Sequence, residues 1–247
     1  MLKIIIIIFI LFIINNYKKI RKIEFNIIKD PDIIISPSGK LGFYLLGICH
    51  YIKNNYDYKD KKILGFSAGS LNSIFMNVDK KYDDYFLKNI FELNLTGMEK
   101  PIHLMQKVND IAITIDICSN MNKQNNSYIS ISTINSLNCY NQFLSTKDLI
   151  KCYNSSCFIP FITFDCLFNF YNGKLAFDSG MHYRKYLSYI DSKPLIINIE
   201  IFGRYKNHTY PFLFTGLKKI NNSIEELYNF GYYDASCNKN ILDSFLL

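Results

Sequence analysis

The segment Gly65-Phe66-Ser67-Ala68-Gly69 is the part of this sequence best suited to nucleophilic chemistry. It follows a short apolar run and precedes a stretch of helical composition, so the serine is expected on a tight turn from strand to helix. Such a turn exposes the serine Oγ, and glycines two residues to either side leave room for the backbone to bend. Ser67 is therefore the candidate nucleophile, with Gly65 and Gly69 as the structural glycines of the turn.

A serine that transfers an acyl group needs a base to accept its hydroxyl proton. Asp178 is one candidate, because it ends a turn and a short strand and is followed by a tight bend at Gly180. A histidine is the alternative, and His208 would complete the chain order serine, aspartate, histidine of the α/β-hydrolases. His50 and His103 are expected to be structural or surface residues. The residue types alone leave both bases open.

The oxyanion of an acyl-transfer intermediate also needs N–H donors. Ser38, Gly39 and Lys40 lie in a loop between an expected strand and an expected helix. A glycine there lets backbone N–H groups approach a ligand at the start of a helix, and Gly42 would let that helix approach the sheet. This loop is the candidate oxyanion hole, and an ordinary connection between strand and helix is the alternative interpretation.

The elements expected to position these residues alternate between strand and helix. Residues 33–35 and 61–64 are typical of buried strands, and residues 41–53 and 68–76 of the helices that follow them. Parallel strands of one sheet place such turns at the same edge, so the oxyanion loop and the turn at Ser67 are expected to lie together.

The rest of the chain continues this alternation. Helices are expected at residues 82–95 and 224–232, and another begins with Ser145 as its N-cap. Strands are expected at residues 111–117, 128–134 and 195–201. The sequence has no internal repeat and no Pro/Gly-rich linker, so the predicted fold class is α/β in a single domain.

Residues 4–14 form an unbroken apolar segment followed by basic residues between positions 18 and 22. Eleven helical residues span about 16 Å, roughly half of a bilayer core, so a short anchor fits better than a full crossing. The segment lacks a small-residue cleavage site after it, which favours retention, and the positive charge behind it favours a domain on the cytoplasmic side. We expect residues 1–29 to be an apolar membrane anchor with a basic flank and residues 30–247 to be the domain. A buried first strand is the alternative for residues 4–14.

Composition narrows the class of protein further. The chain has 247 residues, a hydrophobic fraction of 49% and a net charge of +7, which suits one large α/β domain and excludes a disordered chain. No aromatic and basic residues gather into a nucleic-acid patch, so nucleic acid is not an expected partner. The seven cysteines show no CxxC or Cys/His spacing, so we expect buried free thiols and neither a metal nor a cofactor.

Four ordered blocks of the chain resemble the patatin-like phospholipase family, and within it the branch of adiponutrin and adipose triglyceride lipase. The blocks are Ser38-Gly39-Lys40-Leu41-Gly42-Phe43-Tyr44 with Gly47, the turn from Gly65 to Gly69, Lys147-Asp148-Leu149-Ile150 leading to Ser156-Cys157-Phe158-Ile159-Pro160, and Gly173 to Gly180, with fainter similarity at residues 231–235. The resemblance spans residues 33–180. It implies a three-layer fold whose central, mainly parallel sheet is flanked by helices.

The resemblance also implies a mechanism and a substrate class. Ser67 and Asp178 would form a dyad without histidine, in which Asp178 deprotonates Ser67 directly or through water, and amides near Ser38, Gly39 and Lys40 would hold the oxyanion. The implied activity is that of a membrane-associated serine acylhydrolase, a lipase or phospholipase that cleaves triacylglycerol or phospholipid at a membrane or lipid-droplet surface.

Two positions depart from the family pattern. Pro37 stands where the family has a glycine, and it has no N–H to donate. Ser179 stands where a glycine usually follows the aspartate. These departures keep open the alternative of a catalytically weak or silent lipid-binding protein of the same fold. A lipid transacylase is also an alternative, because it differs from a hydrolase only in whether an alcohol or water resolves the acyl-enzyme.

Overall fold

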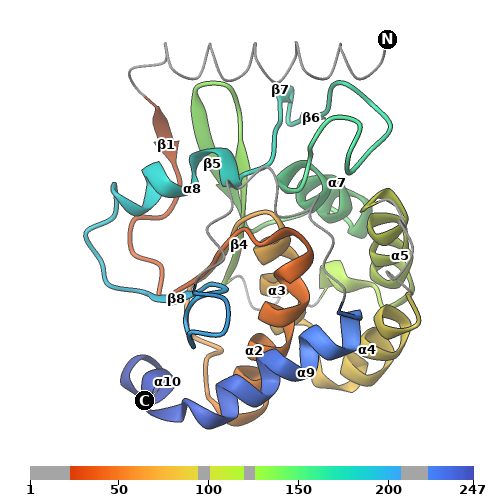
Figure 1. Ribbon diagram of the computed structural model, residues 1–247. Coiled ribbons are helices and arrows are strands. Elements are labelled where there is room, and N and C mark those ends of the chain that lie inside the picture. The colour runs from red at the N-terminus through yellow and green to blue at the C-terminus, as the bar shows by residue number, and fades with distance from the viewer. Residues whose placement is uncertain (1–22, 94–100, 120–125, 207–221) are drawn as a thin grey trace.

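The computed structural model describes residues 23–93, 101–119, 126–206 and 222–247, in which a six-stranded sheet is flanked by helices (Figure 1). The strands of this sheet are β1 (Glu24–Asn26), β2 (Ile33–Ile35), β3 (Ile63–Gly65), β4 (Ser127–Ser132), β5 (Ser136–Tyr140) and β8 (Leu195–Ile197). Their spatial order is β1-β5-β4-β3-β2-β8, and only β4 and β5 pair antiparallel. The predicted α/β class with a mainly parallel central sheet is confirmed.

The α-helices of the described residues connect and cover these strands. They are α2 (Gly42–Asn55), α3 (Ala68–Asn77), α4 (Asp83–Phe91), α5 (Pro101–Thr114), α7 (Thr146–Ser156), α8 (Gly180–Leu187), α9 (Ile224–Cys237) and α10 (Lys239–Leu246). The predicted N-cap of α7 is confirmed, because Ser145 Oγ accepts the backbone N–H of Asp148. A separate antiparallel hairpin of β6 (Phe170–Tyr171) and β7 (Lys174–Leu175) precedes α8.

Both faces of the central sheet are buried. Successive residues of a strand point to opposite faces, and β2 shows the consequence. Ile33 and Ile35 pack in a cluster with residues of α2, α9 and α10. Ile34 packs on the other side against Tyr186 of α8. Helices therefore lie on both faces of the sheet, which explains why β2 is apolar at every position.

The two predicted turns meet at one edge of the sheet. Strands β2 and β3 pair in parallel with Ile35 opposite Gly65. Beyond that pair, the N–H of Phe66 donates to the carbonyl of Ile35 at 3.0 Å. Each strand is followed directly by a loop and a helix, so the loop after β2 and the turn after β3 are neighbours, as the sequence predicted.

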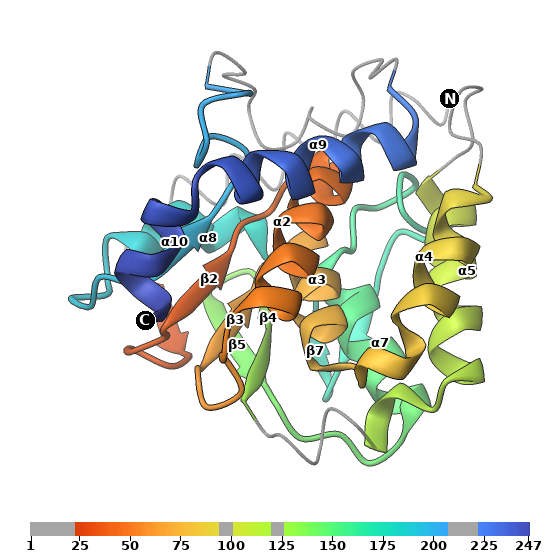
Figure 2. The ribbon, with the colours of Figure 1, turned by 90° about the horizontal axis from the view of Figure 1, so that it is seen from below.

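Helices α2 and α9 cross at two glycines that allow close contact of their backbones, with α9 running across α2 in Figure 2. A Cβ on Gly47 would lie 2.0 Å from the carbonyl oxygen of Tyr228, and one on Gly231 would lie 1.9 Å from that of Tyr44. Nearby, Tyr44 Oη donates to Asp234, which also binds Arg204 through a bidentate pair. The block at residues 231–235 thus fixes α2 and, with it, the loop that precedes α2.

Three sequence predictions need correction. Residues 111–114 belong to helix α5 and not to a strand: Ile111 and Ala112 are buried, whereas Ile113 is 57% exposed. That spacing follows helical periodicity, although alternate isoleucines over residues 111–117 imitate a strand. The late strand ends at Ile197 and does not reach residue 201.

The third correction concerns the start of the domain. Strand β1 lies within residues 1–29, the expected anchor, yet it pairs with β5 along Glu24–Asn26. The domain therefore begins before residue 30. The apolar segment at residues 4–14 and the basic residues behind it lie outside the described residues. Of the helices in the described ranges, none combines the length and apolar character needed to cross a membrane.

Candidate active site

Ser67 and Asp178 meet at the end of the sheet. Ser67 Oγ donates a hydrogen bond of 2.6 Å to Asp178 Oδ2, across 111 residues of sequence. Ser67 lies between β3 and α3, and Asp178 lies two residues before α8. Their exposed fractions are only 6% and 3%, so the pair is shielded from bulk water. Of the two bases considered from sequence, the structure brings Asp178 to the serine.

The backbone at Ser67 has the strained geometry of a nucleophile turn. Its φ of 53° and ψ of −124° are unfavourable for a residue with a side chain, and α3 begins at the next residue. A Cβ on Gly65 would lie 2.5 Å from Ser70 Cα, and a Cβ on Gly69 would lie 2.2 Å from the carbonyl oxygen of Ile35. Both glycines are therefore required by close backbone contacts, and Ser67 is presented at the N-terminus of a helix.

The hydroxyls of Ser70, Ser156 and Ser179 form a hydrogen-bonded cluster next to this turn. The N–H of Ser67 donates to Ser179 Oγ at 2.8 Å and to Ser156 Oγ at 3.1 Å. Ser156 Oγ also shares hydrogen bonds with Ser70 Oγ and Ser179 Oγ. Sequence reasoning assigned no role in the turn to Ser70 or Ser156. The only sequence signal was the position of Ser156 at the start of a block that resembles the patatin-like family.

Asp178 is held by backbone contacts to two other elements. Its N–H donates to the carbonyl of Phe158, just after α7, and Phe177 pairs with Ser132 at the end of β4. Asp178 Oδ1 accepts the N–H of Gly180 at 2.9 Å, so Gly180 supports the carboxylate as well as the bend. Burial raises the pKa of Asp178 to about 7, opposed by the hydrogen bonds from Ser67 and Gly180. The carboxyl is thus suited to exchange a proton near neutral pH.

The expected oxyanion loop forms a short 3-10 helix, Gly39–Leu41, that leads into α2. Gly39 has a φ of 52°, a conformation that favours glycine. The first N–H groups of such a helix have no acceptor within it, which leaves the amides of Gly39 and Lys40 available as donors. Ser38 is buried, and its Oγ has no hydrogen-bond partner among the described residues.

Gly42 brings this loop next to the turn at Ser67. A Cβ on Gly42 would lie 2.9 Å from Ala68 Cβ and 3.4 Å from Ser38 Oγ. Asn72 of α3 also donates to the carbonyl of Gly42 at 3.0 Å. The starts of α2 and α3 are therefore packed together, so the candidate oxyanion donors and the candidate nucleophile border one site.

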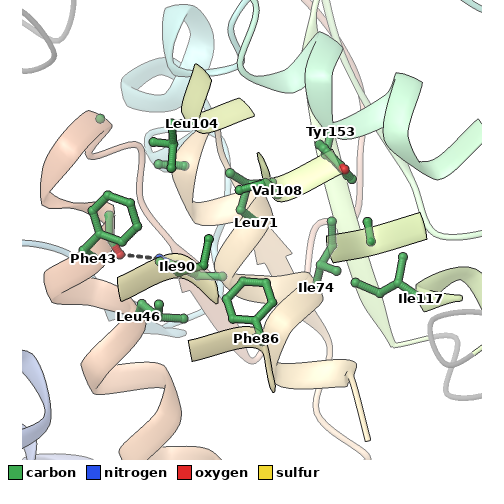
Figure 3. Close-up of a pocket in the computed structure, with 15 residues that line it drawn as sticks. Phe43, Leu46, Leu71, Ile74, Phe86, Ile90, Leu104, Val108, Ile117 and Tyr153 are labelled. Carbon is green, nitrogen blue, oxygen red and sulfur yellow. Dashed lines mark hydrogen bonds between the residues drawn. The ribbon is translucent and has the colours of Figure 1, made fainter. Parts of the chain in front are cut away.

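A cavity of about 60 Å³ opens beside this site (Figure 3). Gly39, Gly42 and Ala68 line it where the two helices begin. From there it extends between α2, α3, α4, α5 and α7, whose lining side chains are mainly apolar. Ser67 itself is not part of the lining, but the residue that follows it is. The arrangement places a hydrocarbon-lined space next to a buried hydroxyl and carboxylate.

The described histidines lie apart from Ser67 Oγ. His50 contacts Tyr228 Oη within the contact of α2 and α9, and burial lowers its pKa to about 4. His103 is exposed on α5. His182, to which sequence reasoning gave no role, shares a 2.8 Å hydrogen bond with Ser132 Oγ, and Ser132 Oγ donates to the carbonyl of Ser179. His208 lies outside the described residues.

The cysteines are all free, and Cys49, Cys118, Cys152 and Cys157 are buried, as expected from their spacing. Cys166 and Cys237 are exposed, and Cys139 is half-buried.

A scan against protein-family models and a search of curated proteins found no match to this chain. The case for function therefore rests on the geometry of the site.

Proposed function

We propose that this protein is a serine acylhydrolase of the patatin-like type that cleaves carboxylic esters of lipids through a Ser67–Asp178 dyad. The observation that carries the proposal is the 2.6 Å hydrogen bond between Ser67 Oγ and Asp178 Oδ2 at a strained turn from strand to helix. The hydrocarbon-lined cavity beside that turn supports a lipid-like acyl group as the substrate.

The chemistry follows from the donor and acceptor atoms present. Ionised Asp178 takes the hydroxyl proton as Ser67 Oγ attacks the ester carbonyl, which gives a tetrahedral oxyanion. Amides of Gly39 and Lys40, with Ser38, would donate to that oxyanion, and α3 adds its N-terminal dipole. Protonated Asp178 then returns the proton to the departing alcohol, which leaves an acyl-enzyme. Asp178 then takes a proton from water as the water oxygen attacks the acyl-enzyme, which gives a second tetrahedral oxyanion. When this intermediate collapses, the bond to Ser67 Oγ breaks, Asp178 returns the proton to Ser67 Oγ, and the carboxylic acid is released.

A serine-directed fluorophosphonate probe tests this proposal on the purified full chain in detergent or lipid. We expect labelling of the protein and none of the Ser67→Ala variant. Ser67→Ala and Asp178→Asn should each lower hydrolysis of a short acyl ester by a factor of about a thousand or more. His208→Ala is the control and should remain active. An inactive His208→Ala variant beside an active Asp178→Asn variant would replace the dyad by a triad.

Pro37 favours a second candidate, a lipid-binding protein of the same fold without catalysis. A proline at this position donates no N–H, so the oxyanion hole has one backbone donor fewer than a glycine would supply. Failure of folded protein to react with the fluorophosphonate would support this candidate. A lipid transacylase would react as a hydrolase does, and only its products, acylated lipid alcohols instead of free fatty acid, would distinguish it.

We propose further that residues 4–14 attach the protein to a membrane or lipid-droplet surface, with the domain on the cytoplasmic side. The apolar run and the basic residues behind it support this placement. Carbonate washing of membranes tests it with the full chain and a variant that lacks residues 4–14. Equal release of the two proteins would remove the anchor from the proposal.

A further inference from the structure

The cavity beside the dyad begins at the residues that would surround a bound ester. Gly39 and Gly42 border it on the side of the candidate oxyanion loop, and Ala68 borders it next to the nucleophile. An ester carbonyl positioned for attack by Ser67 lies between these groups, so one of its two substituents is directed toward the cavity. The cavity is thus a site for a part of the substrate and not a separate pocket.

The walls of the cavity consist mainly of apolar side chains. Figure 3 shows Leu71 and Ile74 between Phe43 on one side and Ile117 on the other. The polar side chains of the lining already have partners. Asn72 donates to the carbonyl of Gly42 at 3.0 Å, and Tyr153 Oη donates to Asn109 Oδ1 at 2.7 Å. An alkyl chain suits such walls, whereas a sugar or a charged group would lose its hydrogen bonds to water there.

The depth of the cavity follows from the helices that form its walls. Along α3, lining residues run from Ala68 to Ile74, and along α2 from Gly42 to Leu46. At 1.5 Å per residue these spans correspond to about 9 Å and about 6 Å. A carbon–carbon bond of about 1.5 Å advances an extended alkyl chain by roughly 1.3 Å per carbon, so about five to seven carbons fit along these walls.

The volume agrees with this depth. A cavity of about 60 Å³ holds a small number of groups the size of water or methylene, since each needs roughly 10–15 Å³ on this scale. Phe86 of α4 and Ala112 of α5 are also part of the lining, and both are buried, with exposed fractions of 8% and 2%. A chain that exceeds this volume would have to displace packed side chains.

We infer that this cavity receives the acyl chain of the substrate and selects chains of about four to eight carbons. This inference rests on the proposed function, because it assigns the acyl side of the same ester. Each methylene that enters the cavity contributes the free energy of one buried CH₂ group, which corresponds to about a fourfold gain in kcat/KM at most. Methylenes in excess of the cavity volume contribute nothing or reduce the rate.

The test is a series of p-nitrophenyl esters with straight acyl chains of two to sixteen carbons, hydrolysed by the full chain in detergent below and above its micelle concentration. We expect kcat/KM to be greatest between four and eight carbons and to fall by about tenfold or more at twelve carbons. An optimum at twelve carbons or longer, or a profile independent of length, would overturn the inference.

Variants of the lining residues test whether the cavity itself causes the selectivity. Ile74→Ala should lengthen the preferred chain, because it enlarges the cavity, and Ala112→Leu should shorten it, because it fills part of the cavity. Ile113→Ala is the matched control for Ile74→Ala, since Ile113 is 57% exposed on α5 and should leave the profile unchanged. Each profile is a ratio of rates within one variant, so it does not depend on how much of that variant folds.

Binding to the Ser67→Ala variant distinguishes this inference from the proposed function. Calorimetric titration with saturated methyl esters of four to twelve carbons should show the tightest binding at six to eight carbons. If the Ser67→Ala variant binds the esters in this way but the unmodified protein does not hydrolyse them, the proposed hydrolase activity would be refuted and the acyl-binding site supported. Hydrolysis whose rate does not depend on chain length would support the proposed hydrolase activity and refute the acyl-binding site.

Discussion

The backbone N–H of Ser67 donates a hydrogen bond of 2.8 Å to the hydroxyl of Ser179, on the residue after the partner carboxylate. Ser179 stands where the resemblance to the patatin-like family expects glycine. Its φ of −68° and ψ of −18° are helical values that any residue adopts, so no glycine is needed there. The serine therefore couples the turn of the nucleophile to the loop of the carboxylate.

Ser179→Gly should impair this protein even though it restores the family residue. The N–H of Ser67 would retain only Ser156 Oγ as its acceptor, and the lost buried hydrogen bond corresponds to about 1 kcal/mol of stability. We expect a lower midpoint in thermal unfolding and an esterase kcat reduced about three- to tenfold. Ser188→Ala, at an exposed serine after α8, is the control. An unchanged or faster Ser179→Gly enzyme would contradict the proposed coupling.

The rate of hydrolysis should depend on pH through Asp178. Its pKa of about 7 means that the ionised, proton-accepting form predominates only above neutrality. We expect kcat/KM to rise about tenfold per pH unit below pH 7 and to level off above it. His182 does not supply this inflection, since burial lowers its pKa to about 4. A pH profile of the His208→Ala variant checks the assignment, because loss of the inflection there would identify a histidine as the base.

Asp178→Asn should stabilise the folded protein at alkaline pH while it abolishes activity. The folded-state pKa of Asp178 lies above its unfolded value, so between about pH 4 and pH 7 the folded state holds a proton that the unfolded state has lost. Stability of the unmodified protein therefore falls across that window and is constant above it. The asparagine keeps an acceptor for Gly180 and has no charge to bury.

Urea unfolding at pH 5 and pH 8 measures this difference. We expect the advantage of Asp178→Asn to be larger at pH 8 than at pH 5 by about 2 to 3 kcal/mol. At pH 5 most of the difference has disappeared, because the folded protein binds the proton. If Asp178→Asn is less stable than the unmodified protein at pH 8, the buried carboxylate does not destabilise the folded state.

Ser38→Ala should separate stability from catalysis at the oxyanion loop. Ser38 Oγ is buried without a hydrogen-bond partner among the described residues, so its removal should be neutral or stabilising by about 1 kcal/mol. If the hydroxyl replaces the donor that Pro37 lacks, kcat should fall about 10- to 100-fold. Stopped-flow hydrolysis and thermal unfolding of the same preparation test both. An unchanged kcat would indicate that backbone amides alone stabilise the oxyanion.

Local patterns in the sequence were sufficient for the turn and for most of the elements. The glycines at 65 and 69 and the apolar run before them predict the strand, the strained turn and the helix, because backbone sterics act over a few residues. The same reasoning failed at residues 111–117, where alternate isoleucines imitate a strand inside and after a helix. In a chain rich in isoleucine, periodicity separates the two poorly.

Other properties of the site depended on contacts between distant parts of the chain. Ser156 and Ser179 lie 89 and 112 residues from Ser67 in sequence, yet both accept a hydrogen bond from its N–H. The residues around these two serines form no local pattern that predicts this contact. The pairing of β1 with β5 likewise placed residues 24–26 in the sheet. The raised pKa of Asp178 and the cavity between five helices arise only when separate elements pack together and exclude water.

The sequence by itself thus determined which residues can do chemistry and the turn that presents the nucleophile, because these depend on residue type and on neighbouring backbone geometry. The tertiary structure decided that Asp178 contacts Ser67, how strongly the pair is buried and which apolar side chains line the cavity beside it. These properties depend on the packing of segments more than a hundred residues apart, and packing is a property of the whole fold.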